Sequence, residues 1–460
     1  MLELTLLEVA RICGGRLADA DPSVAAHGVS TDSRRVRPGQ LFVGLPGANY
    51  DGADYAEAAV AAGAVCALVG REGRLRCPRV VVDDPLAAFG WLGAQWRRRF
   101  VLPAVAITGS CGKTTTKEML ASILSVTRRI CAPPASYNNA VGVPTVLCGL
   151  GPEHEALVIE LGMNAPGEIG ALALLAAPTI GVITNVGPAH IGAFKSLAEI
   201  AAEKVSLAER LGPGGCLIVN ADDPLLARAC AGFKGDVVRF GLKAGDFRAG
   251  AVVETASGLS FSATGIGAVT IPLQGRHNVY NALAAAAAAL ATGLVGAEEV
   301  REGLSRVRPA VMRLERRQVG GRELVLDCYN ANPASLRAAL GWLAGRQGRR
   351  VAVLGTMREL GAFSDRYHEE AGRDAAACGL DLLICVGDAA HQIAEGAREV
   401  GMDSDGILVC LDAEEAARLL AANTREGDIV LIKGSRVERL ERVADEFGRL
   451  VGCSTGLATT

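Results

Sequence analysis

Short apolar runs recur along the chain and alternate with stretches of helical character. The middle of the chain holds five of these runs, at 105–108, 157–160, 180–184, 217–220 and 237–240. Buried strands separated by helices are typical of parallel sheets with helical crossovers. With 460 residues, the chain has room for about two to four domains. We therefore predict an α/β protein whose central domain, over 101–311, contains a parallel sheet.

The two ends of the chain show the same alternation. Residues 1–100 predict a small α/β domain, with strands at 40–45, 64–69 and 80–82 and helices starting at Leu6 and covering 54–62 and 91–99. Residues 312–460 predict a second α/β domain, with strands at 324–327, 351–354, 382–386, 407–411 and 428–432. The polar run at 30–35 reads on its own as a solvated turn.

A glycine-rich turn follows the first central strand and carries the clearest chemical signal. It reads Thr108-Gly109-Ser110-Cys111-Gly112-Lys113-Thr114-Thr115, and we predict that a helix begins at Thr114. A strand-to-helix turn of this kind gathers backbone N–H groups at a helix N-terminus, which favours phosphate. Lys113 would bind the outer phosphates and the Thr114 hydroxyl would bind Mg²⁺. Ile107 replaces the first glycine of the longer pattern, so the loop is a compact form.

Polar residues also end the next two central strands. Ligands of open parallel sheets collect at the carboxyl ends of the strands, so these residues should meet the phosphate loop. Glu160 ends an apolar run, and burying its carboxylate without a partner would be costly, which favours Mg²⁺ over a structural ion pair. Asn185 and His190 follow the third strand, and His190 is either a second metal ligand or a packed residue.

Four other polar residues remain ambiguous from the sequence alone. Lys204 lies on a mostly apolar helix, where a lysine normally extends its ammonium to the surface. Asn138 and Asn139 are consistent with turn geometry in a loop between two helices. Asn278 is consistent with a cap on the alanine-rich stretch 282–297, which is too weakly apolar to span a membrane and reads as a buried helix.

Composition narrows the class of protein. The net charge is −3, the isoelectric point is about 6.2 and no block of one charge sign occurs, which disfavours general nucleic-acid or membrane binding. The 13 cysteines include no C-x-x-C pair and indicate reduced thiols. The N-terminus lacks the features of a secretion signal. We therefore expect a cytoplasmic protein.

Taken together, the motifs closely resemble those of the Mur ligases over essentially the whole chain. The shared motifs are Thr31-Asp32-Ser33-Arg34, the phosphate loop continued through Lys117-Glu118, Asn138-Asn139, the Glu160 strand, His190, Gly275-Arg276-His277-Asn278, Tyr329-Asn330-Ala331-Asn332-Pro333 and Lys433-Gly434-Ser435-Arg436. The Tyr-Asn-Ala-Asn-Pro stretch points to the family member that adds a dipeptide.

The resemblance implies a mechanism and a division of labour. ATP would phosphorylate the terminal carboxylate of UDP-N-acetylmuramoyl-tripeptide, and the amine of D-Ala-D-Ala would attack the acyl phosphate. The N-terminal domain would hold the UDP-sugar, the central domain ATP, and a Rossmann-like C-terminal domain the dipeptide, in a monomer.

The resemblance also implies roles for individual residues. Lys204 matches a lysine that this family carbamylates with CO₂, so that it would hold a second Mg²⁺ together with His190. Asn278, Arg313 and Asp327 would contact the nucleotide, in addition to the phosphate loop. The substrate would be bound by Thr31, Ser33, Arg34, Asn138, Asn139, Asn330 and Asn332.

Three residues depart from the family pattern. Met312 stands where a glycine is usual, Thr356 replaces a common aspartate, and Arg358 replaces an apolar residue. The alternatives to the dipeptide ligase are the ligase that adds the third amino acid, a folylpolyglutamate synthase-like enzyme, and a nucleotide-binding regulator without turnover. The first would need an arginine-bearing loop near 329–333, the second lacks the N-terminal unit, and the third would not need two metal sites.

Overall fold

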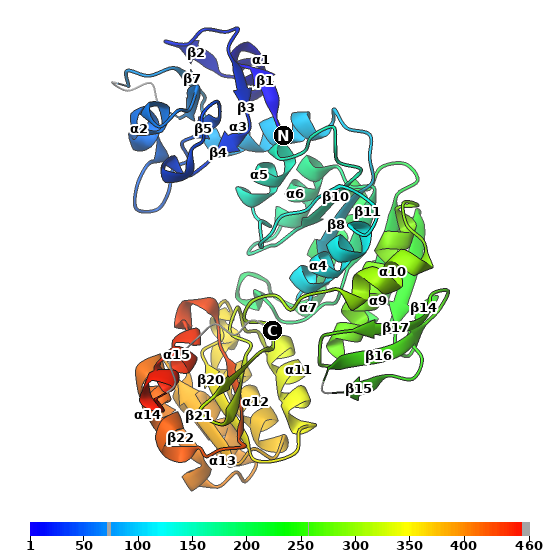
Figure 1. Cartoon of the computed structure of the whole chain (residues 1–460), viewed down its shortest axis with the longest axis vertical. Helices are drawn as coiled ribbons and strands as arrows, with labels where there is room; N and C mark the ends of the chain where they lie inside the picture. The colour runs from blue at the N-terminus through cyan, green and yellow to red at the C-terminus, as the bar shows by residue number, and fades with distance from the viewer. Residues whose placement is uncertain (71–74, 256, 453–460) are drawn as a thin grey trace.

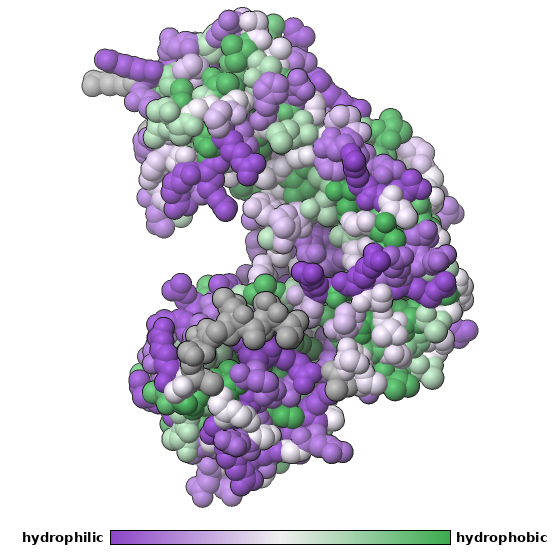
Figure 2. Space-filling model, in the orientation of Figure 1, coloured by the Kyte–Doolittle hydropathy of each residue, from purple (hydrophilic) through white to green (hydrophobic). Residues whose placement is uncertain are grey.

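The computed structural model describes residues 1–70, 75–255 and 257–452, and its elements form a crescent of three α/β units (Figure 1). The N-terminal and C-terminal units lie at the two ends, with the central unit between them. The space-filling view shows a deep indentation on the inner side of the crescent (Figure 2).

The central unit contains a seven-stranded sheet in which all paired strands are parallel. The strand order is β14-β13-β12-β11-β8-β10-β9. The strands are β8 (Ala104–Thr108), β9 (Ile130–Cys131), β10 (Ala156–Glu160), β11 (Ile180–Ile183), β12 (Cys216–Asn220), β13 (Asp236–Gly241) and β14 (Phe247–Arg248). The predicted parallel sheet is thus confirmed. Strand β8 lies inside the sheet, with β10 on one side and β11, the next strand in the chain after β10, on the other, so a topological switch point lies beside β8.

Alternate residues of the central strands pack on opposite faces, as the two-residue period of a strand requires. Val105 and Ile107 of β8 belong to the core that contains Met119 of α4 and the alanines of α9. Ala106 belongs to the core on the other face, with Phe89 of α3. The helices from the end of the N-terminal unit through the central unit are α3 (Pro85–Arg97), α4 (Lys113–Leu124), α5 (Gly142–Cys148), α6 (Glu168–Ala176), α7 (Leu197–Val205), α8 (Pro224–Ala229), α9 (His277–Ala291) and α10 (Ala297–Ser305).

Several element boundaries differ from the predictions. Helix α4 begins at Lys113 rather than Thr114, and the alanine-rich helix α9 ends at Ala291. Gly142 to Pro144 belong to α5 rather than to a loop between two helices. Helix α3 begins at Pro85, because Asp84 caps it by accepting hydrogen bonds from two backbone N–H groups.

A small antiparallel sheet was not predicted. Its strands are β15 (Val253–Thr255), β16 (Gly258–Ala263) and β17 (Gly267–Ile271). Leu259, Phe261 and Ile271 alternate with outward-facing residues and join the core beneath α9. This sheet thereby covers one end of the central unit.

The N-terminal unit has a five-stranded sheet of order β2-β7-β6-β5-β4 and a separate pair, β1-β3. These strands are β1 (Glu3–Thr5), β2 (Arg16–Ala18), β3 (Ala25–His27), β4 (Val29–Ser30), β5 (Leu41–Val43), β6 (Cys66–Val69) and β7 (Arg79–Val81), accompanied by α1 (Leu6–Cys13) and α2 (Ala56–Ala61). Only β5, β6 and β7 were predicted, because these strands are mostly buried and apolar, whereas β1, β2, β3 and β4 are largely exposed or half-buried.

The C-terminal unit has a six-stranded sheet of order β18-β19-β23-β20-β21-β22, parallel except for the β18-β19 pair. Its elements are β18 (Glu315–Val319), β19 (Arg322–Leu326), α11 (Pro333–Ala344), β20 (Arg350–Gly355), α12 (Ser364–Ala377), β21 (Leu382–Val386), α13 (Ala390–Glu399), β22 (Ile407–Cys410), α14 (Ala413–Asn423), β23 (Ile429–Lys433) and α15 (Glu441–Leu450). This arrangement agrees with the predicted Rossmann-like unit. Across the described ranges, no helix combines the length and apolarity that crossing a membrane requires.

Candidate active site

A cavity of about 930 Å³ opens where the carboxyl ends of the central strands face the C-terminal unit. Both units contribute to its wall, so the cavity exists only because they lie together. The predicted site residues that line it are Ser110, Cys111, Gly112, Lys113, Thr114, Thr115, Asn138, Asn139, Glu160, His190, Asn278, Arg313, Asp327, Asn330 and Asn332. Thr31, Ser33, Arg34, Thr108, Gly109 and Lys204 lie outside its lining.

Two glycines allow the loop between β8 and α4 to form. Gly109 and Gly112 have φ angles of 150° and 83°, in the region that favours glycine. A Cβ atom on Gly109 would lie 1.8 Å from Thr184 Oγ1, and one on Gly112 would lie 2.3 Å from Asn281 Oδ1. Side chains at either position would therefore displace the loop.

Asn185 holds the loop from the neighbouring strand end. The backbone N–H of Ser110 donates to the Asn185 carbonyl at 3.0 Å, and that of Cys111 donates to Asn185 Oδ1 at 2.9 Å. These two amides are thus engaged within the protein. The anion site expected from the loop therefore falls to the first-turn amides of α4 and to Lys113, whose Nζ donates to the Gly109 carbonyl at 2.8 Å.

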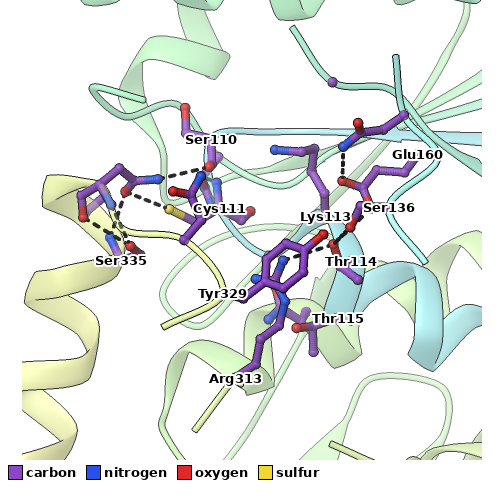
Figure 3. Close-up of a pocket in the computed structure, with 18 of the residues that line it drawn as sticks. Ser110, Cys111, Lys113, Thr114, Thr115, Ser136, Glu160, Arg313, Tyr329 and Ser335 are labelled. Carbon is purple, nitrogen blue, oxygen red and sulfur yellow. Dashed lines mark hydrogen bonds between the residues drawn. The ribbon is translucent and has the colours of Figure 1, made fainter. Parts of the chain in front are cut away.

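Glu160 and Thr114 lie side by side in the wall of the cavity (Figure 3). The Glu160 side chain is 1% exposed. Its Oε2 accepts a 2.9 Å hydrogen bond from Thr114 Oγ1, and its Oε1 accepts one of 2.8 Å from Asn138 Nδ2. A carboxylate and a hydroxyl oxygen this close are the hard oxygen ligands that Mg²⁺ prefers. These two residues therefore fit the predicted first magnesium site.

The C-terminal unit adds an arginine and a buried ion pair. Arg313 Nη2 donates to Thr114 Oγ1 at 3.1 Å, and its guanidinium lies 4.7 Å from the centre of the Tyr329 ring. Lys433 is 2% exposed and its Nζ lies 2.6 Å from Asp327 Oδ2. The arginine and the ion pair bring strong charges of the C-terminal unit to the cavity.

Asn332 connects the two units. It caps α11 by accepting a hydrogen bond from the Ser335 N–H at 2.9 Å. The same Oδ1 lies 3.2 Å from Cys111 Sγ, and Nδ2 donates to the Ser110 carbonyl at 3.4 Å. The C-terminal unit therefore contacts the phosphate loop directly.

His190 contacts the C-terminal unit rather than Glu160. It has a left-handed backbone, with φ of 60°, and its Nδ1 lies 2.6 Å from Glu359 Oε2. This contact holds the pKa of Glu359 below its usual value. The topology thus brings His190 to the cavity as predicted, but its partner, Glu359, was not anticipated.

Lys204 corrects the expectation drawn from its helix. Its side chain is 2% exposed, so it does not extend to the surface. Burial and then the charge of Lys113 lower its pKa well below the usual value. Its Nζ lies 3.7 Å from the sulfur of Met163, which lines the cavity. Within the described ranges, no three His, Cys, Asp or Glu side chains form a metal-binding cluster.

Asn278 corrects a second expectation. It lies inside α9, which begins at His277, rather than at the cap of the helix. Its Nδ2 donates to the Gln274 carbonyl at 2.7 Å, and its Oδ1 accepts a hydrogen bond from Asn281 Nδ2 at 2.9 Å. Sequence reasoning missed Asn281, Ser136 and Tyr280, which also line the cavity. The spacing of Asn278 and Asn281, one helical turn apart, was the signal available for Asn281.

Models of known families match most of the chain. The Mur ligase family, catalytic domain matches residues 25–94, the Mur ligase middle domain residues 107–289, and the Mur ligase, glutamate ligase domain residues 312–436. The UDP-N-acetylmuramoyl-tripeptide–D-alanyl-D-alanine ligase of Escherichia coli K12 is 38% identical over 453 residues, covering 96% of this chain and 98% of that protein. The chain belongs to the Mur ligase family. It is therefore an ATP-dependent amide ligase.

Solved structures agree with this membership. MurF from Acinetobacter baumannii matches 98% of this Mur ligase with a TM-score of 0.90 and 33% identity, over 99% of that chain. MurF from Thermotoga maritima in complex with ADP matches 93% with a TM-score of 0.82 and 26% identity, over 98% of that chain. The three-domain α/β architecture predicted from the sequence is thus confirmed.

The polar turn of the N-terminal unit lies apart from the cavity of this Mur ligase. Asp32 caps a short 3-10 helix, Ser33–Arg35, and pairs with Arg34 through two hydrogen bonds of 2.9 Å. The bonds from Arg34 lower the pKa of Asp32 to about 2.

Of the three departures from the family pattern, Met312 has an unfavourable backbone conformation, and Thr356 and Arg358 have local partners. Met312 has a φ of 55°, the left-handed conformation for which glycine is suited. The Thr356 hydroxyl accepts a hydrogen bond from the Ala389 N–H at 3.3 Å. Arg358 pairs with Glu438 at 2.7 Å and with Asp388 at 3.0 Å. Arg358 thus joins the loops that follow three strands of the C-terminal sheet.

Proposed function

We propose that this Mur ligase adds D-alanyl-D-alanine to UDP-N-acetylmuramoyl-tripeptide, giving the UDP-muramoyl-pentapeptide used to build peptidoglycan. The observation that carries the proposal is the shared cavity, in which the phosphate loop and Glu160 face the Asn330–Asn332 segment. The full-length similarity to ligases of this name supports the choice of substrates.

The residues suit activation of a carboxylate, which is a poor electrophile. Lys113 and the first-turn amides of α4 would bind the terminal phosphate of ATP, and Arg313 would approach it from the C-terminal unit. The tripeptide carboxylate oxygen attacks that phosphorus and ADP leaves. The dipeptide amine then attacks the acyl carbon, a tetrahedral intermediate forms, and phosphate leaves. Positioning and charge neutralisation supply most of the rate of such transfers.

Mg²⁺ belongs to this proposal. Thr114 and Glu160 would hold the first ion, which would neutralise phosphate charge as the terminal phosphoryl group is transferred. His190 and a carbamate on Lys204 would hold a second ion. Burial lowers the pKa of the Lys204 amine, which favours its neutral form. This supports carbamylation, because CO₂ forms the N–C bond with a neutral amine and a proton is released.

The same proposal covers the domain roles. The N-terminal unit, 1–100, would bind the UDP-sugar at Thr31, Ser33 and Arg34, and the central unit, 101–311, would bind ATP. The C-terminal unit, 312–460, would admit the dipeptide beside Asn330 and Asn332. Asn138 and Asn139 would contact the peptide together with Asn330 and Asn332. The enzyme would act as a monomer in the cytoplasm.

A substrate panel tests the proposal. Purified protein should release phosphate from ATP only when UDP-N-acetylmuramoyl-tripeptide and D-Ala-D-Ala are both present. Equal turnover with a single amino acid in place of D-Ala-D-Ala would favour the ligase that adds the third amino acid. Nucleotide binding without turnover on any substrate would favour the regulator.

A variant tests the carbamate separately. Lys204→Ala should lose activity, and added short carboxylates should restore part of it by occupying the vacated volume. Undiminished activity in this variant would remove the carbamate from the mechanism.

A further inference from the structure

Lys117 is a buried cation that none of the steps above uses. It lies on α4, four residues after Lys113, and its side chain has 0% exposure. Its Nζ donates to the Pro133 carbonyl at 2.6 Å and to the Ala135 carbonyl at 3.4 Å. The same atom lies 2.7 Å from Glu118 Oε1. An ammonium has three N–H donors, so these three acceptors satisfy it.

The two carbonyls belong to a segment that has no helix or strand of its own. Residues 132–139 connect β9 to the start of α5. The Tyr137 N–H donates back to the Ala135 carbonyl at 2.9 Å, which closes a tight turn beside the Lys117 contacts. Without regular backbone pairing, the position of such a segment depends on the few side chains that hold it.

The far end of this segment reaches the reactive part of the cavity. Ser136 Oγ lies 3.3 Å from Thr114 Oγ1, and Asn138 Nδ2 donates to Glu160 Oε1 at 2.8 Å. The Asn138 carbonyl accepts from the Gly162 N–H at 2.8 Å. The segment therefore connects the buried ammonium on one side with the Thr114–Glu160 pair on the other.

We propose that Lys117 is a positioning residue that anchors segment 132–139, so that Ser136 and Asn138 are held against Thr114 and Glu160. The role in turnover rests on the proposed function, whereas the anchoring does not. An anchored segment keeps the Glu160 carboxylate in one orientation and fixes the wall against which the tripeptide would bind. A displacement of about 1 Å at such a wall can lower the rate about 100-fold.

Hydrogen exchange tests the anchoring directly. In Lys117→Met, which keeps the volume and removes the charge, the Tyr137 and Gly162 amides should exchange at least about tenfold faster. The Ser110 and Cys111 amides, held by Asn185, should keep their rates. Uniform acceleration of all four amides, or no acceleration of any, would overturn the proposal.

Kinetics test the consequence for the reaction. For Lys117→Met we expect kcat/KM for UDP-N-acetylmuramoyl-tripeptide to fall about 10- to 100-fold, with ADP affinity within about twofold of the original. A parallel loss of ADP affinity would mean that Lys117 supports the phosphate loop instead. Combining Lys117→Met with Asn138→Ala should be no worse than Asn138→Ala alone, because both act through one segment.

A matched variant separates the segment from the ion pair. Glu118→Gln removes the salt-bridge partner and leaves both carbonyl contacts, so exchange and kinetics should match the original protein. Lys117→Gln, which retains one donor group, takes the place of Lys117→Met if the latter does not fold, with a smaller change in the same direction expected. Inactivity of the unsubstituted protein would refute the proposed function, while the exchange pattern would still decide the role of Lys117.

Discussion

Removing Lys433 should open the C-terminal sheet locally. Its Nζ contacts Asp327 Oδ2 at 2.6 Å and the carbonyls of Asp327 and Asn330 at 3.2 and 3.3 Å. Lys433→Met would leave a carboxylate and two carbonyls without this donor. Removing one partner of a buried pair typically costs about 3–5 kcal/mol, and the 17% exposure of Asp327 points to the lower end, about 3 kcal/mol.

Hydrogen exchange is the appropriate assay, because a protein of several domains does not unfold in two states. The Asp327 N–H donates to the Ile432 carbonyl between β19 and β23, so its exchange reports on this part of the sheet. A cost of about 3 kcal/mol corresponds to exchange faster by roughly 100-fold.

A double variant provides the control. Asp327→Asn combined with Lys433→Met removes both charges and should bring exchange back to within about tenfold of the original, since a neutral pair needs no buried countercharge. Exchange of Asp327 in Lys433→Met within threefold of the original, or a double variant as unprotected as the single one, would refute this reasoning.

Three further outcomes follow from the site. Lys113→Ala should lower kcat about 10²- to 10³-fold in a phosphate-release assay with both substrates present, since it removes one preorganised charge from the proposed phosphate site. A change of less than threefold would contradict the proposed role of Lys113 in binding the transferred phosphate. Lys204→Met should raise the melting temperature in CO₂-free buffer at pH 7.5, and the gain should shrink as the pH approaches 10. Burial lowers the Lys204 pKa in the folded state, so the unfolded chain binds the extra proton and the stability of the original protein rises with pH over that range. An unchanged or lower melting temperature at pH 7.5 would count against a buried neutral amine. Met312→Gly should stabilise the local structure by up to about 1 kcal/mol by relieving the left-handed backbone, whereas Met312→Ala should not. Hydrogen exchange of the Tyr329 amide, which donates to the Met312 carbonyl at 3.3 Å, can measure this difference. A large loss of protection in Met312→Gly would show that the Met312 side chain matters more than its backbone.

The sequence predicted the parts of the fold that depend on local pattern. Strands β8 and β10 were recognisable because they are apolar up to their last residues, Thr108 and Glu160, and β11, which precedes Asn185, was recognisable because it has no polar side chain. Because ligands of parallel sheets bind at the carboxyl ends of the strands, we expected the phosphate loop, Glu160 and His190 to lie close together, and they line one cavity. The two-residue strands β9 and β14 were missed, since strands this short carry almost no periodicity. The sheet β15-β17 was missed as well, because β15 is short and exposed, and the longer strands β16 and β17 begin with glycine and mix serine or threonine with their apolar residues.

The parts of the site that were missed depend on contacts between distant segments. The pairing of His190 with Glu359 joins residues from two units, and the burial of Lys204 depends on the packing around Met163. Asn185 was recognised as a polar strand end, yet its engagement of two loop amides could not be foreseen. Such details arise from tertiary packing, which overrides the preferences of a single helix or loop.

Transfer of an oxygen isotope tests the central claim that ATP activates the substrate carboxylate at this cavity. UDP-N-acetylmuramoyl-tripeptide labelled with ¹⁸O in its terminal carboxylate would be incubated with the protein, ATP, Mg²⁺ and D-Ala-D-Ala, and the phosphate released would be analysed by mass spectrometry. An acyl phosphate intermediate predicts one ¹⁸O atom in each phosphate formed. Amide product accompanied by unlabelled phosphate would contradict the mechanism.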